Sequence, residues 1–250
     1  MTFNENNANI NWTRQMTVDT AFNVYSDAQG GDPDSTSPTL RKYHMTLWSK
    51  PLPNGQIFEL SGNKSGVYLY HNSEIGEYFL GSDAITHSYK NHKQKHWITK
   101  QIPNEVDELF DAGSTIGAYT IFPNNRIDGK HTLNQARGVN SFIDDRFDLT
   151  LECVRLFYLG QVSPLYDTLL RYKNFFDLFE SFNGYVKFFL LDDLVDENQK
   201  MKFYLPFDGF KTKPTFSNID EYLVYKNGVL TFIKSRNKRI ENYDNQQTTQ

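Results

Sequence analysis

The sequence predicts an α+β fold, with a mixed or antiparallel sheet flanked by helices and a helical C-terminal third. Short runs of alternating or mostly apolar residues predict strands, and longer runs with a helical period predict helices. The chain of 250 residues is 38% hydrophobic and 15% aromatic, which suffices for a full hydrophobic core. We therefore expect a flexible polar arm over residues 1–18, a single globular domain over 19–243 and a frayed tail over 244–250.

Strands are expected in the first half of the chain. The segment 114–123, STIGAYTIFP, is apolar enough for a central strand. Shorter strands are expected before it, where apolar and polar residues alternate between turn-forming residues. These shorter strands are residues 21–27, 56–60, 67–71 and 77–83.

Helices are predicted from start signals and from periodicity. Ser37 and Pro38 supply an N-cap and a first helical residue for a helix that ends near Ser49. Thr132 is a second predicted N-cap, for a long helix that runs towards Gly160. The other expected helices are 84–101, 104–113, 165–182, 185–195 and 217–243, the last of which could bend at Gly228.

The long helix after Thr132 is the best candidate for a functional site. Two apolar stripes predict that it is buried on two sides, and Arg146 falls inside the apolar arc, where a charge must be paired. Between the two apolar stripes lies a polar seam, which consists of Arg137, Asp144, Asp148, Glu152 and Arg155. Such a seam is commonly a set of structural ion pairs, each contributing about 0.2–0.5 kcal/mol. A helix break at Gly138 would remove Arg137 from this seam.

The turn between the strand at 114–123 and the long helix carries Arg126 and Asp128. A helix N-terminus offers free N–H groups and a partial positive charge, so an anionic ligand could bind at this junction. Arg126 and Asp128 could equally brace the turn without binding anything.

Composition excludes several classes of function. The formal charge of −4 and the pI near 5.9 provide no basic field for sequence-independent capture of nucleic acid. The one cysteine, Cys153, lies in an apolar stripe and is expected to be a small core residue. The N-terminus has no signal-peptide pattern, and no run approaches the ~18 apolar residues of a membrane span. We expect a cytoplasmic protein without membrane contacts.

Four strings resemble the characteristic blocks of a bacterial family of uncharacterised proteins, classed as a domain of unknown function. They are DPDSTSPTLRKYHMTLWSKPLPNG, IDGKHTLNQARG, DRFDLTLECVRLFYLG and FFLLDDLVDEN. The resemblance implies a bacterial or phage cytosolic protein and no particular activity. Leu156 stands where a typical member has a second basic residue, so a paired basic motif after Arg155 is not expected.

The favoured functional hypothesis is an enzyme or effector that acts on or binds a nucleotide or nucleic-acid phosphate through an Arg/Asp/His site. Arginines would clamp the phosphate, while a histidine or carboxyl group would act as acid or base. Carboxylates beside arginines could instead hold a divalent cation. The candidate catalytic residues are His44, Asp144 and Asp148, and the candidate ligand-binding residues are Arg41, Arg126, Asp128, Arg137, Arg146 and Arg155.

Two other functional readings stay open, and the sequence does not decide whether the protein is an enzyme. One is a non-enzymatic protein-binding module, a regulator or a phage-encoded inhibitor of a host complex, with Trp12 and Trp97 as anchors. The other is an NAD-using ADP-ribosyltransferase, which YLYHNS followed by GEYFLGSD faintly suggests. For that enzyme the spacing is too short and no catalytic glutamate is placed.

Overall fold

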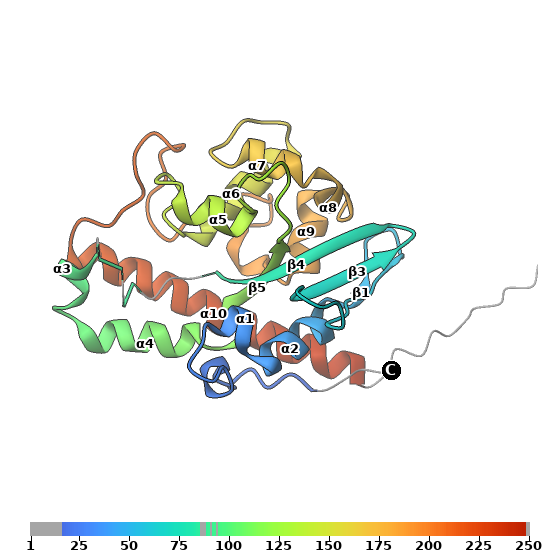
Figure 1. Ribbon diagram of the computed structural model, residues 1–250. Helices are drawn as coiled ribbons and strands as arrows, with labels where there is room; N and C mark the ends of the chain where they lie inside the picture. The colour runs from blue at the N-terminus through green and yellow to red at the C-terminus, as the bar shows by residue number, and fades with distance from the viewer. Residues whose placement is uncertain (1–16, 86–88, 91, 94, 249–250) are drawn as a thin grey trace, which may run out of the picture.

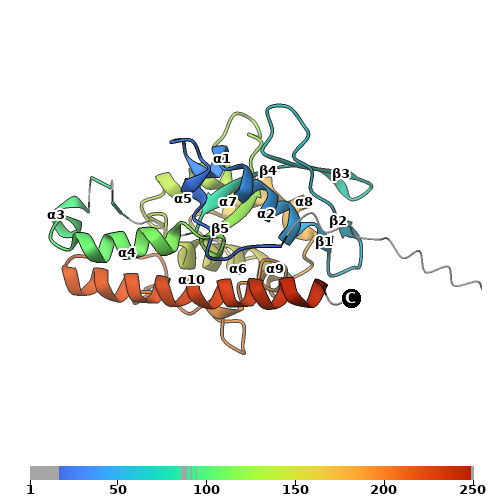
Figure 2. The same cartoon turned by 90° about the horizontal axis from the view of Figure 1, so that it is seen from below.

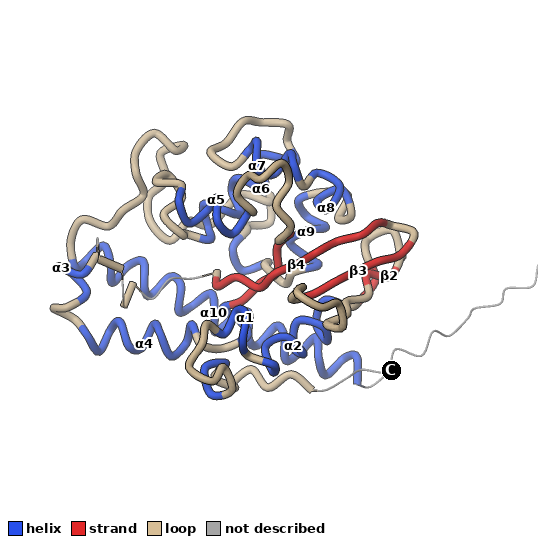
Figure 3. The backbone as a smooth tube through the Cα atoms, viewed as in Figure 1, coloured by secondary structure: helices blue, strands red, loops and turns tan. Residues whose placement is uncertain are grey.

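The computed structural model describes residues 17–85, 89–90, 92–93 and 95–248. The described part combines helices with two small antiparallel sheets, which confirms the predicted α+β class. The smaller sheet pairs β1 (Lys50–Pro51) with β2 (Ile57–Phe58). The larger sheet lies between helices on both of its faces (Figures 1 and 3).

The larger sheet has the strand order β3-β4-β5, with β3 at Leu69–Ser73, β4 at Gly76–Ala84 and β5 at Tyr119–Pro123. β3 pairs with β4 only as far as Leu80, whereas β5 continues the pairing to Ala84. One edge of β4 at residues 82–84 therefore has no strand beside it. The backbone groups on that edge need other hydrogen-bond partners.

Ten helices and three short 3-10 turns, η1 to η3, surround the sheet in the described residues. The helix bounds are α1 (Pro33–Thr36), α2 (Pro38–Trp48), α3 (His96–Thr99), α4 (Pro103–Gly113), α5 (Leu133–Val139), α6 (Phe147–Tyr158), α7 (Tyr166–Arg171), α8 (Lys173–Asp177), α9 (Phe182–Phe188) and α10 (Ile219–Thr248). The 3-10 turns are η1 (Val24–Ser26), η2 (Ile116–Ala118) and η3 (Asp192–Leu194). Helices α1 and α2 lie on one side of the sheet and α5 to α9 on the other, while α4 runs beside the first half of α10 (Figures 1 and 2).

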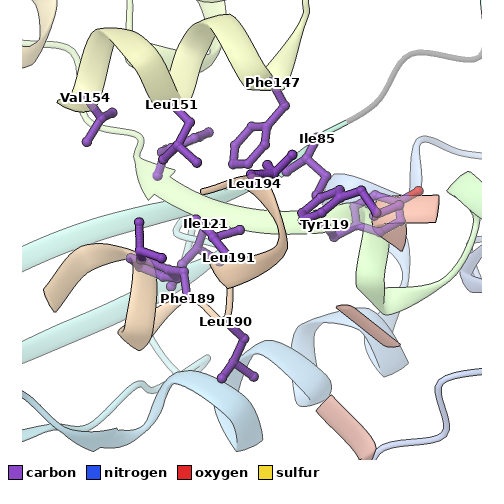
Figure 4. Close-up of a cluster of buried hydrophobic side chains, with 14 of the residues drawn as sticks. Ile85, Tyr119, Ile121, Phe147, Leu151, Val154, Phe189, Leu190, Leu191 and Leu194 are labelled. Atoms are coloured by element: carbon purple, nitrogen blue, oxygen red, sulfur yellow. The ribbon is translucent and has the colours of Figure 1, made fainter. Parts of the chain in front are cut away.

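The strand β5 confirms the second half of the predicted strand at 114–123, whereas residues 116–118 form η2. The predicted central position is wrong, because β5 lies at the edge of the three-stranded sheet. All five of its residues are buried. Figure 4 shows why an edge strand can be so apolar: Phe147 and Leu151 of α6 and Phe189 after α9 surround Ile121. Packing by helices replaces the second neighbouring strand that a central position would have supplied.

The predicted long helix is interrupted between α5 and α6. Helix α5 starts at Thr132, which forms the predicted N-cap together with Gln135 as a capping box, and ends at Val139. Asn140 then accepts a hydrogen bond from the backbone of Phe142, a local turn that competes with helix continuation. Asp144 and Asp145 follow in the left-handed region, at φ of 48° and 58°. Arg137 is thereby separated from the rest of the predicted seam.

Four other predicted elements differ from the structure. One is the helix 185–195, in which α9 ends at Phe188, Leu190 follows at φ of 54° and η3 comes after it. Residues 21–27 form no strand but contain η1, whose N-cap Asn23 accepts from the backbone of Tyr25. In the described part of 84–101, β4 extends to Ala84 and the helical residues are those of α3. The expected single helix 165–182 is divided at Tyr172 into α7 and α8. Short-range periodicity alone does not register such breaks.

A hydrogen bond joins the two ends of the described chain. Residues 1–16 of the predicted arm lie outside the described residues, and the backbone N–H of Val18 donates to Asp244 Oδ2 at 3.3 Å. Helix α10 runs to Thr248 without a break at Gly228, so the expected tail boundary at 244 falls inside this helix. No helix among the described residues combines the length and apolarity needed to cross a membrane.

Candidate functional site

Arg146 and Asp148 form a closed ion pair at the start of α6. The Arg146 guanidinium donates from Nε to Asp148 Oδ1 at 3.1 Å and from Nη2 to Oδ2 at 2.5 Å. Oδ2 also accepts from the backbone N–H of Tyr204 at 2.9 Å. Both side chains are buried, which confirms that the charge of Arg146 is paired. With three donors around it, the Asp148 carboxylate is held by the fold and is not presented to solvent.

Arg137 and Arg155 belong to two further, separate pairs. Arg137 Nη1 lies 2.5 Å from Asp83 Oδ2, and the same guanidinium donates to the carbonyl oxygens of Ala84 and Asp145. Arg155 makes a bidentate contact with Glu152 on the same helix, at 2.7 and 2.8 Å.

The remaining candidates of the strand-to-helix region are also dispersed. Asp144 Oδ2 lies 3.1 Å from Lys95 Nζ. Arg126 is exposed and donates to Gln135 Oε1 at 3.3 Å, and Asp128 is exposed in a turn at φ of 53°. The structure therefore does not bring Arg126, Arg137, Asp148 and Arg155 into one open pocket. A pocket common to all of them is excluded by this geometry, and their individual ligand-binding roles stay predictions.

A different set of polar side chains does converge, at the open edge of β4. We call it the β4-edge cluster; it consists of Asp34, Arg41, His44, Tyr68, Ser82, Asp83, Asn134 and Arg137. Successive residues of a strand point to opposite faces. Ser82 accordingly contacts α1 and α2, whereas Asp83 contacts α5.

The backbone of the open edge is satisfied by these side chains. Asn134 Nδ2 donates to the carbonyl oxygen of Ser82 at 2.9 Å, and Arg137 donates to that of Ala84 at 3.0 Å. The Asp34 carboxyl group lies near the backbone N–H of Ala84. Side chains of α1 and α5 thus interact with the part of the β4 edge that β3 does not cover.

A chain of hydrogen bonds runs through the interior of the cluster. The indole Nε1–H of Trp48 can only donate, and it donates to His44 Nδ1 at 3.1 Å. His44 must then carry its hydrogen on Nε2, which lies 3.0 Å from Ser82 Oγ. Ser82 Oγ donates in turn to Asp34 Oδ1 at 2.7 Å. Each donor in this relay points towards Asp34.

Burial keeps His44 neutral. Its side chain is fully buried, and this desolvation, together with the charge of Arg236, lowers its pKa to about 3. His44 therefore orients Ser82 through one fixed tautomer and carries no charge near neutral pH. The hypothesis that His44 is itself an acid or base is not favoured by this environment, because the proton on Nε2 is committed to Ser82.

Asp34 has the opposite properties. Burial raises its pKa to about 7, the nearby Asp83 carboxylate adds to the increase, and the hydrogen bond from Ser82 partly offsets it. No lysine or arginine among the described residues lies within ion-pair distance of Asp34. Its side chain is only partly buried, unlike Asp148. Asp34 is thus a carboxyl group that exchanges its proton near neutral pH.

Arg41 stands at the outer side of the cluster. Its guanidinium lies 4.7 Å from the centre of the Tyr68 ring, and no described carboxylate lies within ion-pair distance of it. Burial and the Asp34 charge raise the pKa of the Tyr68 hydroxyl, and Arg41 opposes them, so both charges act at this hydroxyl. Arg41 is the predicted arginine that combines partial exposure, membership of the cluster and a free charge.

A metal centre receives no support from the described residues. No group of three or more His, Cys, Asp or Glu side chains in this part of the chain is arranged to hold an ion. Cys153 is buried, and burial raises the pKa of its thiol to about 12, in agreement with its expected place in the core.

The sequence hypothesis included Arg41, His44 and Arg137 but missed Asp34, Ser82 and Asn134. Asp34 falls in the turn-rich segment before Ser37, where carboxylates usually cap local turns. Ser82 lies near the end of β4, and no motif flanks it. The contact between Asp34 and Ser82 joins residues 48 positions apart, so no local pattern could have indicated it.

Comparison with family models gives one match. It is described as a family of unknown function, DUF6994, and it covers residues 18–240. The chain belongs to DUF6994. This confirms the predicted resemblance to an uncharacterised family, and it adds nothing on a bacterial origin. The residues of the chain that match DUF6994 include the whole β4-edge cluster. Comparisons with curated proteins and with solved structures found no match.

Proposed function

We propose that the protein is a cytoplasmic enzyme that acts on a nucleotide or nucleic-acid phosphate at the β4-edge cluster. Asp34 is the general acid and base, and Arg41 is the anion-binding residue. The observation that carries the proposal is the relay from Trp48 through His44 and Ser82, which ends in the partly exposed carboxyl group of Asp34. No lysine or arginine in the described part of the chain pairs with this group.

The acid–base role follows from the surroundings of Asp34. A group that titrates near neutral pH both takes up and releases a proton at low cost, which is the property a general acid or base needs. In hydrolysis of a phosphate ester, a water molecule attacking phosphorus gives a proton to the Asp34 carboxylate. The protonated Asp34 then gives that proton to the leaving oxygen. Ser82 is a positioning residue that holds the orientation of the carboxylate.

The preference for an anionic substrate follows from Arg41. A guanidinium with free N–H donors matches the oxygens of a phosphate, and its stacking on Tyr68 orients it. Arg137, by contrast, already spends its donors on Asp83 and two carbonyl groups. The neutral state of His44 leaves Arg41 as the positive charge of the cluster that a substrate could reach.

The proposal is tested by ligand binding and by turnover. Binding of inorganic phosphate and of nucleoside mono-, di- and triphosphates is measured by calorimetry, and hydrolysis of the same nucleotides is followed by ³¹P NMR. Arg41→Ala is expected to weaken binding about tenfold or more, because a charge-assisted contact is lost. Asp34→Asn is expected to retain binding and to abolish turnover, and the wild-type rate should change with pH near 7.

Arg126→Ala is the matched control, since Arg126 is an exposed arginine at the strand-to-helix junction. Equal binding by wild type and Arg41→Ala, together with a loss in Arg126→Ala, would move the anion site to that junction and contradict the proposal. Unchanged turnover in Asp34→Asn would remove the acid–base role.

A second candidate function, non-enzymatic protein binding, is favoured by exposed apolar side chains. Trp97, one of the two predicted anchors, is 52% exposed, and Leu159 and Val162 are 56% and 82% exposed. Trp12, the other anchor, lies outside the described residues. On this hypothesis the protein is a regulator or an inhibitor that binds a host protein, and a pull-down should recover the complex. Trp97→Ala or Val162→Asp should abolish the complex, whereas Arg41→Ala should leave it intact.

A further inference from the structure

A cavity of about 500 Å³ is lined by residues near the start of α6, at the beginning of α10 and in the loop that leads into α10, and not by the β4-edge cluster. Figure 1 shows the course of this loop into α10. Phe142, Phe207, Phe210 and Val224 supply apolar walls of the cavity, and Arg146 lies on its inner side. Its volume is in the range of cavities that enclose small organic ligands.

The loop presents its aromatic rings in a fixed arrangement. The Phe207 ring stacks on Phe203 with centroids 4.2 Å apart and meets Phe210 edge-on at 4.8 Å. Asp208 accepts hydrogen bonds from Lys211 N and Thr212 Oγ1 at 3.0 and 2.7 Å, which closes the turn between the rings. Phe210 is held at a φ of 62°, an unfavourable conformation for a bulky residue. These contacts preorganise the wall.

The charges around the cavity favour a cation. The cavity is lined by three carboxylates, Asp208, Asp220 and Glu221, and by one lysine, Lys213. The positive charge of Arg146 is neutralised by Asp148. Asp208 and Glu221 accept hydrogen bonds from their own neighbouring residues.

Asp220 differs from the other two carboxylates. Among the described residues its side chain has no hydrogen-bond or ion-pair partner, and it is exposed in the first turn of α10. It is the carboxylate best placed to meet a ligand's charge. Aromatic faces also attract a cation, because each ring carries negative charge above its plane.

We infer that this cavity binds a small organic cation with an apolar body. The body packs against Phe207 and Phe210, and the ammonium group lies at Asp220. Such a site is separate from the proposed catalytic residues, so a ligand bound there is an effector or a second substrate group and not the phosphate itself.

The test uses phenethyltrimethylammonium as the probe, with 3-phenylpropionate as an anion of similar body and tetramethylammonium as a cation without one. Binding is measured by calorimetry on the full chain, and ¹H–¹⁵N NMR shift changes locate the site. The cation with the ring should bind at least about tenfold more tightly than either comparison compound. Its shift changes should centre on Phe207, Phe210 and Val224.

Two variants separate the charge from the apolar body. Asp220→Asn should weaken the probe about fivefold to tenfold, and Phe207→Leu should weaken it although the wall stays apolar. Asp167→Asn is the matched control, since Asp167 is also an exposed acid in the first turn of a helix, and it should change nothing. Tighter or equal binding of 3-phenylpropionate, shift changes elsewhere, no binding of the probe, or less than about a twofold effect of Asp220→Asn would each overturn the inference.

Discussion

Two carboxylates, Asp148 and Asp34, show how similar groups acquire different roles in one fold. Asp148 is fully buried, and the Arg146 guanidinium and a backbone N–H occupy both of its oxygens. Asp34 is only partly buried, accepts a hydrogen bond from the neutral Ser82 hydroxyl and lies near the Asp83 carboxylate. No lysine or arginine that the structure describes forms an ion pair with it. The comparison shows that the surroundings hold the Asp148 carboxylate in an ion pair, whereas Asp34 is the carboxyl group of the proposed site.

The largest effect is expected from Asp148→Ala. It leaves the Arg146 charge buried without a counter-ion, so the free energy of unfolding should fall by about 3–5 kcal/mol. Urea denaturation followed by circular dichroism measures this loss. The paired-carboxylate account would be contradicted by a loss below about 1 kcal/mol, because a pair that can be opened so easily is not a structural lock.

Asp34→Asn should change how stability depends on pH. The folded-state pKa is about 7 against an ordinary value of 3.8, so the folded protein binds the proton more tightly than the unfolded chain. Stability contributed by this group is therefore present at low pH and is lost as pH rises from about 4 to about 7. Because the side chain is partly exposed, we expect a fall of about 1–3 kcal/mol in wild type and a smaller fall in the variant.

Denaturation at a series of pH values from about 4 to about 8 measures this difference. Asp111→Asn, which removes an exposed carboxylate from the last turn of α4, is the control for loss of one surface charge. Parallel stability curves for wild type and Asp34→Asn would remove the distinction between the two carboxylates.

Ser82→Ala breaks the relay in the middle and should cost about 1–3 kcal/mol of stability. It leaves the buried Nε2–H of His44 without its acceptor and Asp34 without its hydroxyl donor. The pKa of Asp34 should rise further, because the Ser82 hydrogen bond stabilises its ionised form. A Ser82→Ala protein with unchanged stability and an unchanged Asp34 titration would show that the relay is not formed in solution.

The smallest effect is expected from Arg155→Ala. Its bidentate pair with Glu152 lies on one helix, where the Arg155 side chain is 24% exposed and that of Glu152 6%. Because truncation of the partly exposed Arg155 opens Glu152 to water, the loss should cost about 1 kcal/mol. Thermal unfolding compared with Glu152→Gln checks this. A cost as large as that of Asp148→Ala would mean that burial of the cation does not decide the strength of these pairs.

Local signals account for what the sequence predicted correctly. Ser37 and Thr132 act as N-caps because a hydroxyl followed by helix-forming residues satisfies the first free N–H groups wherever it stands. The requirement that Arg146 be paired also followed from its place in an apolar arc, and the structure meets it with Asp148. These inferences depend on residues within a few positions of one another.

What the sequence missed depends on distant contacts. The break after α5 removes Arg137 from the predicted seam and lets it pair with Asp83, 54 residues earlier in the chain, while its Nε donates to Thr150 of α6. The relay likewise joins α1, α2 and β4, and the backbone contacts of Asn134 and Arg137 depend on the edge of β4 that β3 leaves open beyond Leu80. The local sequence around a residue does not predict where the edge of a sheet will lie.

The most direct test of the account is the titration of the Asp34 carboxyl group itself. ¹³C NMR of the side-chain carboxyl carbons, with Asp34→Asn to assign the signal, gives its pKa in the folded protein. We predict half-titration at about pH 7. A value near 4, the ordinary value for an aspartate in water, would contradict the claim that this carboxyl group is set apart for acid–base chemistry.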